Sequence, residues 1–354
     1  MLAIDPQDPL SIAPVGQPAA LPGTFPNTVT ASAKNGLVCV GMSGSQAGIS
    51  CGRFDSENGI GQMDALRPFD LGQSDPPVGP LNTVSQTFFS ADETVLFTTV
   101  KGDPTVNNTG FLSVFPVTGA AAGANVQARH EQGHGQAQSQ KKPQQKGQHK
   151  PGPKGKGKGK GKGKGKNGTP PPVATPGGQA CVSTQETRSS PNGTAVLFGS
   201  LPIPNTNPPQ IFATDASFGA AILSVDSSLT ASTLAAQAID GQTATCWVTI
   251  SPATNSAFVT DVGVNRIVEM SLDDASILNE IDLSQVQESA GQGGLIDLRV
   301  AGDFVYALAP GDGSAAVAVN VVDIRSGELV DRKEFETEGA NFVSASAMGM
   351  AVLL

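Results

Sequence analysis

Residues 84–100 read VSQTFFSADETVLFTTV, two apolar and β-branched stretches joined by a polar turn. Alternating side chains on both sides of a short polar turn are typical of paired antiparallel strands. The pattern returns in residues 244–271, where ATCWVTIS, PATNS and AFVTDVG precede RIVEMS. Units of this kind begin near Thr28, Val84, Thr194, Ala244 and Leu295. Their spacing, mostly about 45–55 residues, is that of four-stranded propeller blades. The repeat predicts an all-β protein, a β-propeller.

Five complete blades can be followed, and the two chain ends suggest part of another. The second blade finds its fourth strand beyond a long interruption, in ACVSTQETR at residues 180–188. Residues 2–21 read as outer strands, and residues 341–354 read as inner strands. Pairing them into one composite blade would remove exposed sheet edges. We therefore expect six to seven blades, incomplete or composite at the N-terminus.

The composition agrees with short strands and tight turns. The chain has 354 residues, of which 42 are Gly and 26 are Pro, and 38% are hydrophobic. Gly and Pro favour turns, while Val and Thr favour strands. The nearest candidate for a helix is Asp226–Asp240, and no stretch is apolar and long enough to span a bilayer.

Residues 119–176 interrupt the blade pattern with Gly, Gln, Lys and Pro. With almost no apolar side chains to bury, this segment is predicted to be a disordered insertion between a propeller part at 1–118 and the remainder at 177–354. Residues 129–166 hold eleven Lys, one Arg and one Glu, a charge of +11, whereas the rest of the chain carries −20. The Lys-Gly run could bind polyanions such as acidic polysaccharide, with a strong dependence on salt. Its lysines are Lys154, Lys156, Lys158, Lys160, Lys162, Lys164 and Lys166.

Four cysteines and three glycosylation sequons favour an oxidising, secretory route. Cys39 and Cys51 lie on two stretches around a Gly/Ser-rich turn, which predicts a disulfide across a hairpin. Cys181 and Cys246 could pair between blades or remain separate thiols. The sequons begin at Asn107, Asn167 and Asn192. The first ten residues, MLAIDPQDPL, lack the basic start and the apolar run of a signal peptide.

Several strings resemble a known family. They are IDPQDP at residues 4–9, the VCVG…GISC hairpin, SQTFFSADE, ATDA at Ala213–Ala216, GQTATCW, TDVG and YALAP. In this order they resemble fungal 3-carboxymuconate cyclase-like proteins of the seven-bladed lactonase propeller group. The resemblance implies a secreted or cell-wall protein, with a signal peptide and further strands before the first string, so we expect this chain to lack an N-terminal part.

The family label implies a cycloisomerase or lactonase, which needs a cationic pocket and a group that moves a proton. In lactonase relatives a His on an inner strand is expected to face the channel, but the corresponding strand here has Ser85. All three His residues, His130, His134 and His149, lie in the insertion. We therefore assign no catalytic residue. His130-Glu131-Gln132-Gly133-His134 matches a zinc motif in form, but its Gly and flexible flanks argue against a helix, and no metal or cofactor is expected.

Polar residues near inner strands are candidates for a channel pocket. Asp297 and Arg299 alternate in LIDLRV and should share one strand face. Trp247 could stack on a ligand or pack in the core. Gln86, Asp240 and Gln242 complete this set.

Three functions follow from these features. We expect a secreted or cell-surface propeller that binds a ligand or matrix component without cyclase activity. The first alternative is a lactonase or cycloisomerase for a carboxylated muconate or lactone, acting around Asp297 and Arg299. The second is an adhesive surface protein that holds polyanions through the Lys-rich insertion. No membrane span and no sequence-specific nucleic-acid binding are expected.

Overall fold

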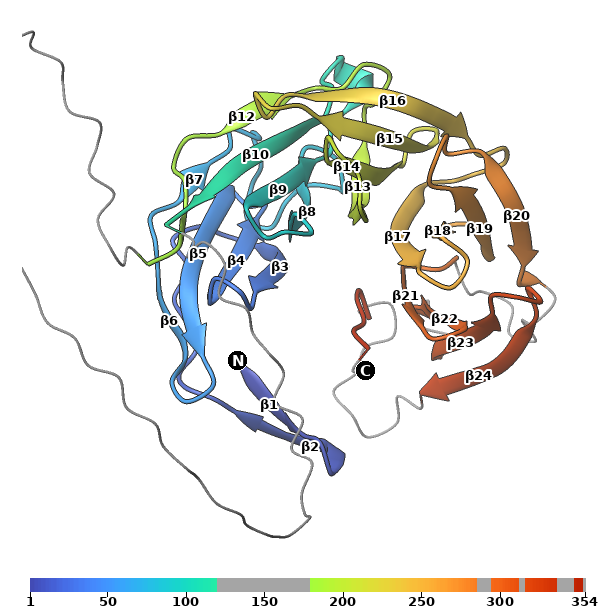
Figure 1. Ribbon diagram of the computed structural model, residues 1–354, viewed down its shortest axis with the longest axis horizontal. Helices are drawn as coiled ribbons and strands as arrows, with labels where there is room; N and C mark the ends of the chain where they lie inside the picture. Colours follow the sequence, from blue (N-terminus) through green and yellow to red (C-terminus); the bar gives the residue numbers. More distant parts are fainter. Residues whose placement is uncertain (120–178, 285–293, 312–315, 336–346, 353–354) are drawn as a thin grey trace, which may run out of the picture. The chain divides into compact units, whose positions relative to one another are not determined.

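The computed structural model describes residues 1–119, 179–284, 294–311, 316–335 and 347–352. Met1–Ala120 and Gln179–Leu354 form one compact unit, whose sheets follow one another around an arc (Figure 1). Within the described residues, no helix has the length and apolar character needed to cross a membrane. The Lys-Gly run, the three His residues and Asn167 lie outside the described residues.

The five predicted blades are confirmed as five antiparallel sheets in chain order. The first contains β3 (Pro26–Ser32), β4 (Leu37–Met42), β5 (Gly48–Asp55) and β6 (Gly59–Met63), with β7 (Arg67–Pro68) beside β5. The third contains β13 (Leu197–Ile203), β14 (Gln210–Asp215), β15 (Gly219–Val225) and β16 (Ala231–Ala238). The fourth contains β17 (Thr245–Ser251), β18 (Ser256–Asp261), β19 (Arg266–Ser271) and β20 (Ile277–Asp282). The fifth contains β21 (Asp297–Ala301), β22 (Phe304–Ala309), β23 (Val317–Asp323) and β24 (Leu329–Phe335).

The second blade is assembled from both sides of the insertion, as predicted. It contains β8 (Val84–Phe89), β9 (Val95–Val100) and β10 (Phe111–Thr118). The short 3-10 helix η1 (Pro104–Val106) lies between β9 and β10. The edge of β10 pairs with β12 (Thr187–Ser189) near its start and with β11 (Cys181–Val182) near its end. Thr118 and Cys181 are direct partners in this register, so the blade closes across the insertion.

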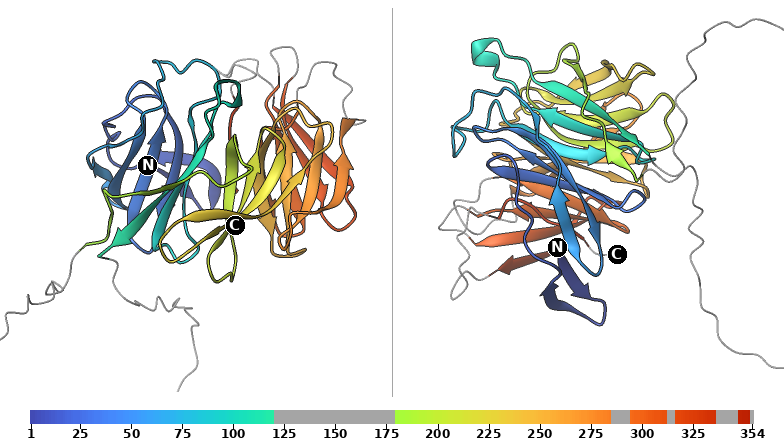
Figure 2. Two further views of the ribbon diagram at one scale, coloured as in Figure 1. Left: turned by 90° about the horizontal axis from the view of Figure 1, so that it is seen from above. Right: turned by 90° about the vertical axis from the view of Figure 1, so that its left-hand side faces the viewer.

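Neighbouring blades pack through apolar side chains. Their first strands, β3, β8, β13, β17 and β21, contact one another in succession and lie innermost in Figure 1. Each interface has its own core, such as Phe212 of the third blade with Val248 and Val259 of the fourth. Burial of these large side chains is the main force that holds sheet against sheet. Figure 2 shows the same sheets standing side by side when viewed from the edge.

The composite blade expected from the chain ends is not formed by the described residues. A hairpin of β1 (Leu2–Asp5) and β2 (Asp8–Pro14) is a sheet of two strands that pairs with no other described strand. Residues 347–352 are not assigned to a strand. They instead lie against β21, where the Met350 N–H donates to Asp297 Oδ2 at 2.8 Å. A buried carboxylate, not a strand partner, holds this segment.

The structure joins Cys39 and Cys51, the pair expected from the hairpin. The two residues are direct partners on β4 and β5, with their Cα atoms 4.1 Å apart. The Cys51 N–H donates to Asp64 Oδ1, so it is not available for a hydrogen bond from β5 to β4. Of the two alternatives for the other cysteines, the structure has the separate thiols, with Cys181 exposed and Cys246 buried. Cys181 lies on the outer strand β11 and Cys246 on the inner strand β17, which explains why they do not meet.

Candidate functional site

A cavity of about 460 Å³ is lined by residues from several blades, which lie at the same end of each blade. The first and second strands of these blades pair so that Val84 faces Val100, Leu197 faces Asp215 and Thr245 faces Asp261. The residues that directly follow the second strands are Lys101, Ala216 and Val262, and all three line the cavity. The residues that directly precede the first strands contribute Val196, Ala244 and Ile296. Equivalent positions of the repeat therefore form one wall of small apolar side chains, with a single Lys among them.

Lys101 is the feature of this site that the sequence reasoning missed. Lys101 is 8% exposed, and its Nζ lies 4.3 Å from the centroid of the Phe198 ring. No ion pair joins Lys101 to a carboxylate in the described part of the chain. Burial lowers the pKa of Lys101 to about 8, because a charged amine loses hydration there. An alignment of the blade repeats could have identified Lys101. At the position after the second strand, the third and fourth blades have the apolar residues Ala216 and Val262, and only the second blade among these three has a Lys.

Aromatic and sulfur side chains form the rest of the wall near Lys101. Phe198 on β13 lines the cavity and meets Trp247 on β17 edge to face, with ring centroids 5.2 Å apart. Cys246 and Met348 also line it. Burial raises the pKa of the Cys246 thiol, which the nearby Lys101 charge only partly offsets, so the thiol remains protonated at neutral pH.

Two predicted channel residues brace the site through backbone hydrogen bonds. Gln86 on β8 accepts from the Ser200 N–H at 2.6 Å and so links the second blade to the third. Gln242 donates to the Ala216 carbonyl at 3.1 Å and accepts from the Thr245 N–H at 3.0 Å, which holds two cavity-lining residues in place. Asp240 is exposed, and its carbonyl accepts from Arg266. Trp247 packs behind Phe198 and against the core between the fourth and fifth blades.

Asp297 and Arg299 share one face of β21, and they bind each other. Arg299 Nη1 lies 2.5 Å from Asp297 Oδ1 and also donates to the Leu298 carbonyl. Asp297 is 1% exposed, and burial raises its pKa while Arg299 and the Met350 and Leu298 N–H groups act in the opposite direction. Neither side chain belongs to the described lining of the cavity. Within the pair it is Asp297 that anchors residues 347–352 beside the site, through the Met350 N–H.

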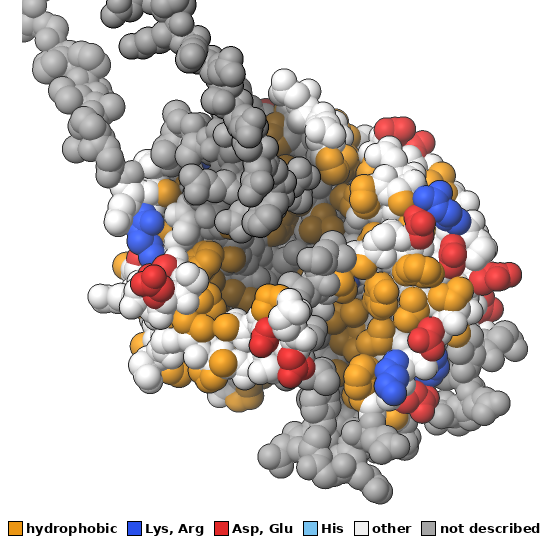
Figure 3. All heavy atoms as spheres, turned by 60° about the horizontal axis from the view of Figure 1, so that its bottom comes forward, with side chains coloured by type: hydrophobic (Ala, Val, Ile, Leu, Met, Phe, Trp, Pro, Cys, Tyr) orange, Lys and Arg blue, Asp and Glu red, His pale blue; other side chains and the backbone are white. Residues whose placement is uncertain are grey.

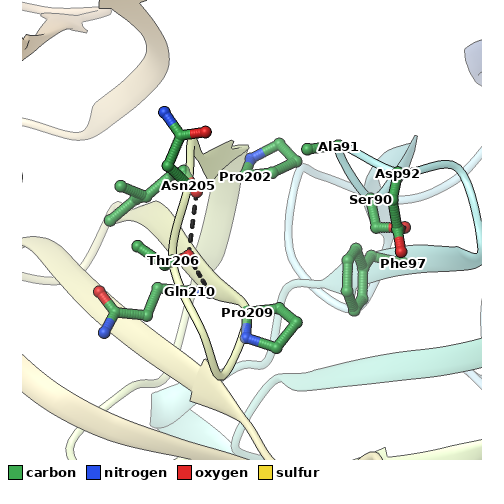
Figure 4. A pocket seen from close by; sticks show the side chains of 10 residues that line it. Ser90, Ala91, Asp92, Phe97, Pro202, Asn205, Thr206, Pro209 and Gln210 are labelled. Atoms are coloured by element: carbon green, nitrogen blue, oxygen red, sulfur yellow. Dashed lines mark hydrogen bonds between the residues drawn. The ribbon is translucent and has the colours of Figure 1, made fainter.

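A second hollow of about 170 Å³ lies between the turns that join β8 to β9 and β13 to β14 (Figure 4). Its charged residue, Asp92, accepts from Ser90 Oγ at 2.7 Å and from Thr94 Oγ1 at 2.8 Å. Burial raises the pKa of Asp92, but these hydrogen bonds outweigh it and lower the pKa overall. Because this charge is already satisfied by its own turn, the hollow is a weaker candidate than the cavity at Lys101.

The remaining predicted sites are surface features. Asn107 and Asn192 are exposed, and Asn107 ends η1 in a left-handed conformation. Among the described residues, no three His, Cys, Asp or Glu side chains gather in a way that could hold a metal ion. On the face shown in Figure 3, hydrophobic side chains gather toward the middle and most charged ones lie farther out.

No protein-family model matches the chain, and no curated protein matches its sequence. Solved structures do resemble it. The periplasmic gluconolactonase PpgL of Pseudomonas aeruginosa matches with 14% identity and a TM-score of 0.54, over 94% of this chain and 78% of that one. A putative 6-phosphogluconolactonase from Bacteroides uniformis matches with 15% identity and a TM-score of 0.49, over 87% and 71%. A protein from Lactobacillus plantarum matches with 12% identity and a TM-score of 0.49, over 86% and 69%. At such identity the likeness to PpgL shows the fold alone, a β-propeller.

Proposed function

We propose that this propeller binds a small, largely apolar molecule that carries one carboxylate group. The observation that carries the proposal is Lys101, a cation inside an apolar cavity with no carboxylate partner among the described residues. Burying a charge without a counterion is costly, and a ligand that brings the counterion removes that cost. The apolar wall then contacts the body of the ligand, while Lys101 orients its anionic end.

The cavity is poorly suited to a sugar lactone, which needs several hydrogen-bond partners for its hydroxyl groups. Two hydroxyl groups belong to its lining, and both donate elsewhere. Ser217 Oγ donates to Asp215 Oδ1 at 2.5 Å, and Thr245 Oγ1 donates to Gln242 Oε1 at 2.5 Å. A 3-carboxymuconate carries several carboxylates, for which one Lys is too few. We therefore propose that the resemblance to fungal 3-carboxymuconate cyclase-like proteins lies in the architecture and not in the activity.

A lactonase or cycloisomerase is the second candidate, favoured by the likeness of the fold to a gluconolactonase. Incubation with a carboxymuconate or a sugar lactone, followed by ultraviolet absorbance, tests it. Turnover above the buffer rate that disappears in Lys101→Met would establish this candidate. A rate equal to that of buffer alone would remove it.

The proposed site of action is the cell surface or the extracellular space. The Cys39–Cys51 disulfide supports an oxidising compartment, and the exposure of Asn107 and Asn192 supports glycosylation. Expression in a secretory host, followed by mass analysis before and after glycosidase treatment, tests both. Unmodified Asn107 and Asn192 in the secreted protein would contradict the glycosylation part.

Isothermal titration with 2-naphthoate tests the binding function, with neutral 2-naphthamide as the matched ligand. Lys101→Met should weaken 2-naphthoate about tenfold or more, because a hydrogen bond to a charged group contributes about 1.5–3 kcal/mol. It should leave 2-naphthamide within about twofold, since the apolar contacts remain. Lys333→Met, at an exposed position, is the control for the loss of a positive charge. Equal affinity of 2-naphthoate for the wild type and Lys101→Met would contradict the proposal.

A further inference from the structure

Lys101 is only 8% exposed, and its amine has few partners for a residue buried to this extent. In the described part of the chain it donates no hydrogen bond and forms no ion pair, and it lies over the face of Phe198. It also opens onto a cavity large enough for a ligand of two fused rings. A lysine that is held in an apolar pocket, without a bound carboxylate, is suited to act as a nucleophile as well as a cation.

We infer that Lys101 captures small apolar aldehydes in this cavity as a reversible imine. This capture rests on the site proposed above and extends its function from ionic to covalent binding. The ligands are aromatic or aliphatic aldehydes without a charged group, for which the apolar wall supplies the contacts.

The reaction needs no partner other than the aldehyde. The lone pair of the neutral amine forms a bond to the carbonyl carbon, and the carbonyl π electrons move to the oxygen, which takes up the proton that the nitrogen releases. The resulting carbinolamine loses its hydroxyl group as water while the second N–H proton leaves, and the C=N bond forms. One aldehyde and one amine thus yield one imine and one water, and hydrolysis reverses the reaction. The lowered pKa of Lys101, about 8, supplies neutral amine near physiological pH.

The neighbouring carboxylates indicate capture without further turnover. Carbon–carbon chemistry on an imine requires a base that removes a proton from the bound carbon chain. Asp215 accepts from the Ala195 and Val196 N–H groups, and Asp261 accepts from the Thr243 N–H. Asp297 is paired with Arg299. Each of these three carboxylates is therefore engaged, and the imine is expected to be the end product.

Reductive trapping tests the inference. The full-length protein is incubated with 2-naphthaldehyde and cyanoborohydride at pH 8, and its peptides are analysed by mass spectrometry for the added naphthylmethyl group. At pH 8 about half of the Lys101 amine is neutral, on the order of 100-fold more than in a lysine of pKa about 10.4. Part of this gain is lost because a weaker base is a weaker nucleophile. Lys101 should therefore be labelled about tenfold faster than Lys34 and Lys333, and 2-naphthoate should slow its labelling.

Two variants separate this inference from the binding proposal. Lys101→Arg keeps the charge but cannot form the imine, so it should still prefer 2-naphthoate over 2-naphthamide while its labelling at position 101 disappears. Labelling of wild-type Lys101 no faster than that of Lys34 and Lys333, and unaffected by 2-naphthoate, would overturn the imine. If 2-naphthoate still depends on Lys101 in that case, the binding proposal survives alone. If neither ligand depends on Lys101, both fail.

Discussion

At the scale of single residues, Lys101 sets the chemistry of the site and also acts against stability. The residue is 8% exposed, and its amine lies beside Phe198 with no counterion among the described residues. Its folded pKa of about 8 lies below the ordinary value near 10.5, so the folded protein holds the proton less tightly than the unfolded chain does. Below pH 8 both states are protonated, and the folded state bears the full cost of the buried charge. This cost decreases as the pH rises from 8 to about 10.5, because the unfolded chain then binds more protons.

Replacement of Lys101 by Met is therefore expected to stabilise the protein at neutral pH. The gain should be about 3 kcal/mol at pH 7, since each pKa unit corresponds to about 1.4 kcal/mol. It should shrink between pH 8 and pH 10.5. Urea unfolding of the wild type and the variant at pH 7, 9 and 10 measures the difference, with Lys333→Met as control. A variant less stable than the wild type at pH 7, or a difference that grows with pH, would contradict this reading.

At the scale of elements, each blade approaches its neighbour at the first strand. Gly199 on β13 lies directly against β17, and a Cβ added there would lie 2.7 Å from the Cys246 carbonyl oxygen and 2.8 Å from Trp247 Cα. Both atoms belong to the backbone of the next blade, so neither can move aside alone. The same two strands carry Phe198, Cys246 and Trp247, which form and support the cavity wall. The close approach of β13 and β17 thus determines the shape of the site.

Gly199→Ala should separate these blades, reduce stability by about 1–3 kcal/mol and weaken 2-naphthoate binding. Gly61→Ala is the matched control, because a Cβ there would meet its nearest atom, the Arg53 carbonyl oxygen, at an ordinary 3.5 Å. Thermal unfolding and titration calorimetry of both variants provide the comparison. Equal melting temperatures for the two variants would show that the blades can shift at no cost.

The strands show how much of the secondary structure the local sequence pattern predicts. The five blades and the displaced edge of the second blade were predicted from alternation and spacing alone. The nearest candidate for a helix, Asp226–Asp240, contains β16, in which burial alternates residue by residue. Ala and Leu tolerate either structure, so here the pairing with β15 outweighs helix propensity.

At the scale of the whole molecule, the five-bladed unit has its own cores, and its second blade contains strands from both sides of residues 120–178. Thr118 and Cys181 are partners across that gap. Gly119, Gln179 and Ala180 would then make a three-residue hairpin loop, a length that natural hairpins use.

Excision of residues 120–178 should therefore leave the fold intact and raise its stability by up to about 3 kcal/mol, because a shorter connection loses less entropy on closure. The excised segment includes all eleven lysines of the basic stretch. If the insertion binds polyanions, the shortened protein should leave a heparin column at much lower salt than the full chain. Thermal unfolding and salt elution measure the two effects. Unchanged retention would contradict the polyanion role, and a lower melting temperature would contradict the independence of the blades.

By itself the sequence determined the all-β class, the five blades, the hairpin that places Cys39 opposite Cys51, and the absence of His from the blade segments. These features depend on neighbours along the chain, where alternation and turn residues act directly. Tertiary structure decided that Lys101 is buried, that Asp297 and Arg299 pair with each other, that Gln86 and Gln242 bind backbone, and that Cys181 and Cys246 do not meet. Several of those outcomes join residues more than 40 positions apart, such as Lys101 with Phe198, Gln86 with Ser200 and Asp297 with Met350. They depend on how separate segments come together, which alternation and turn residues along the chain do not determine.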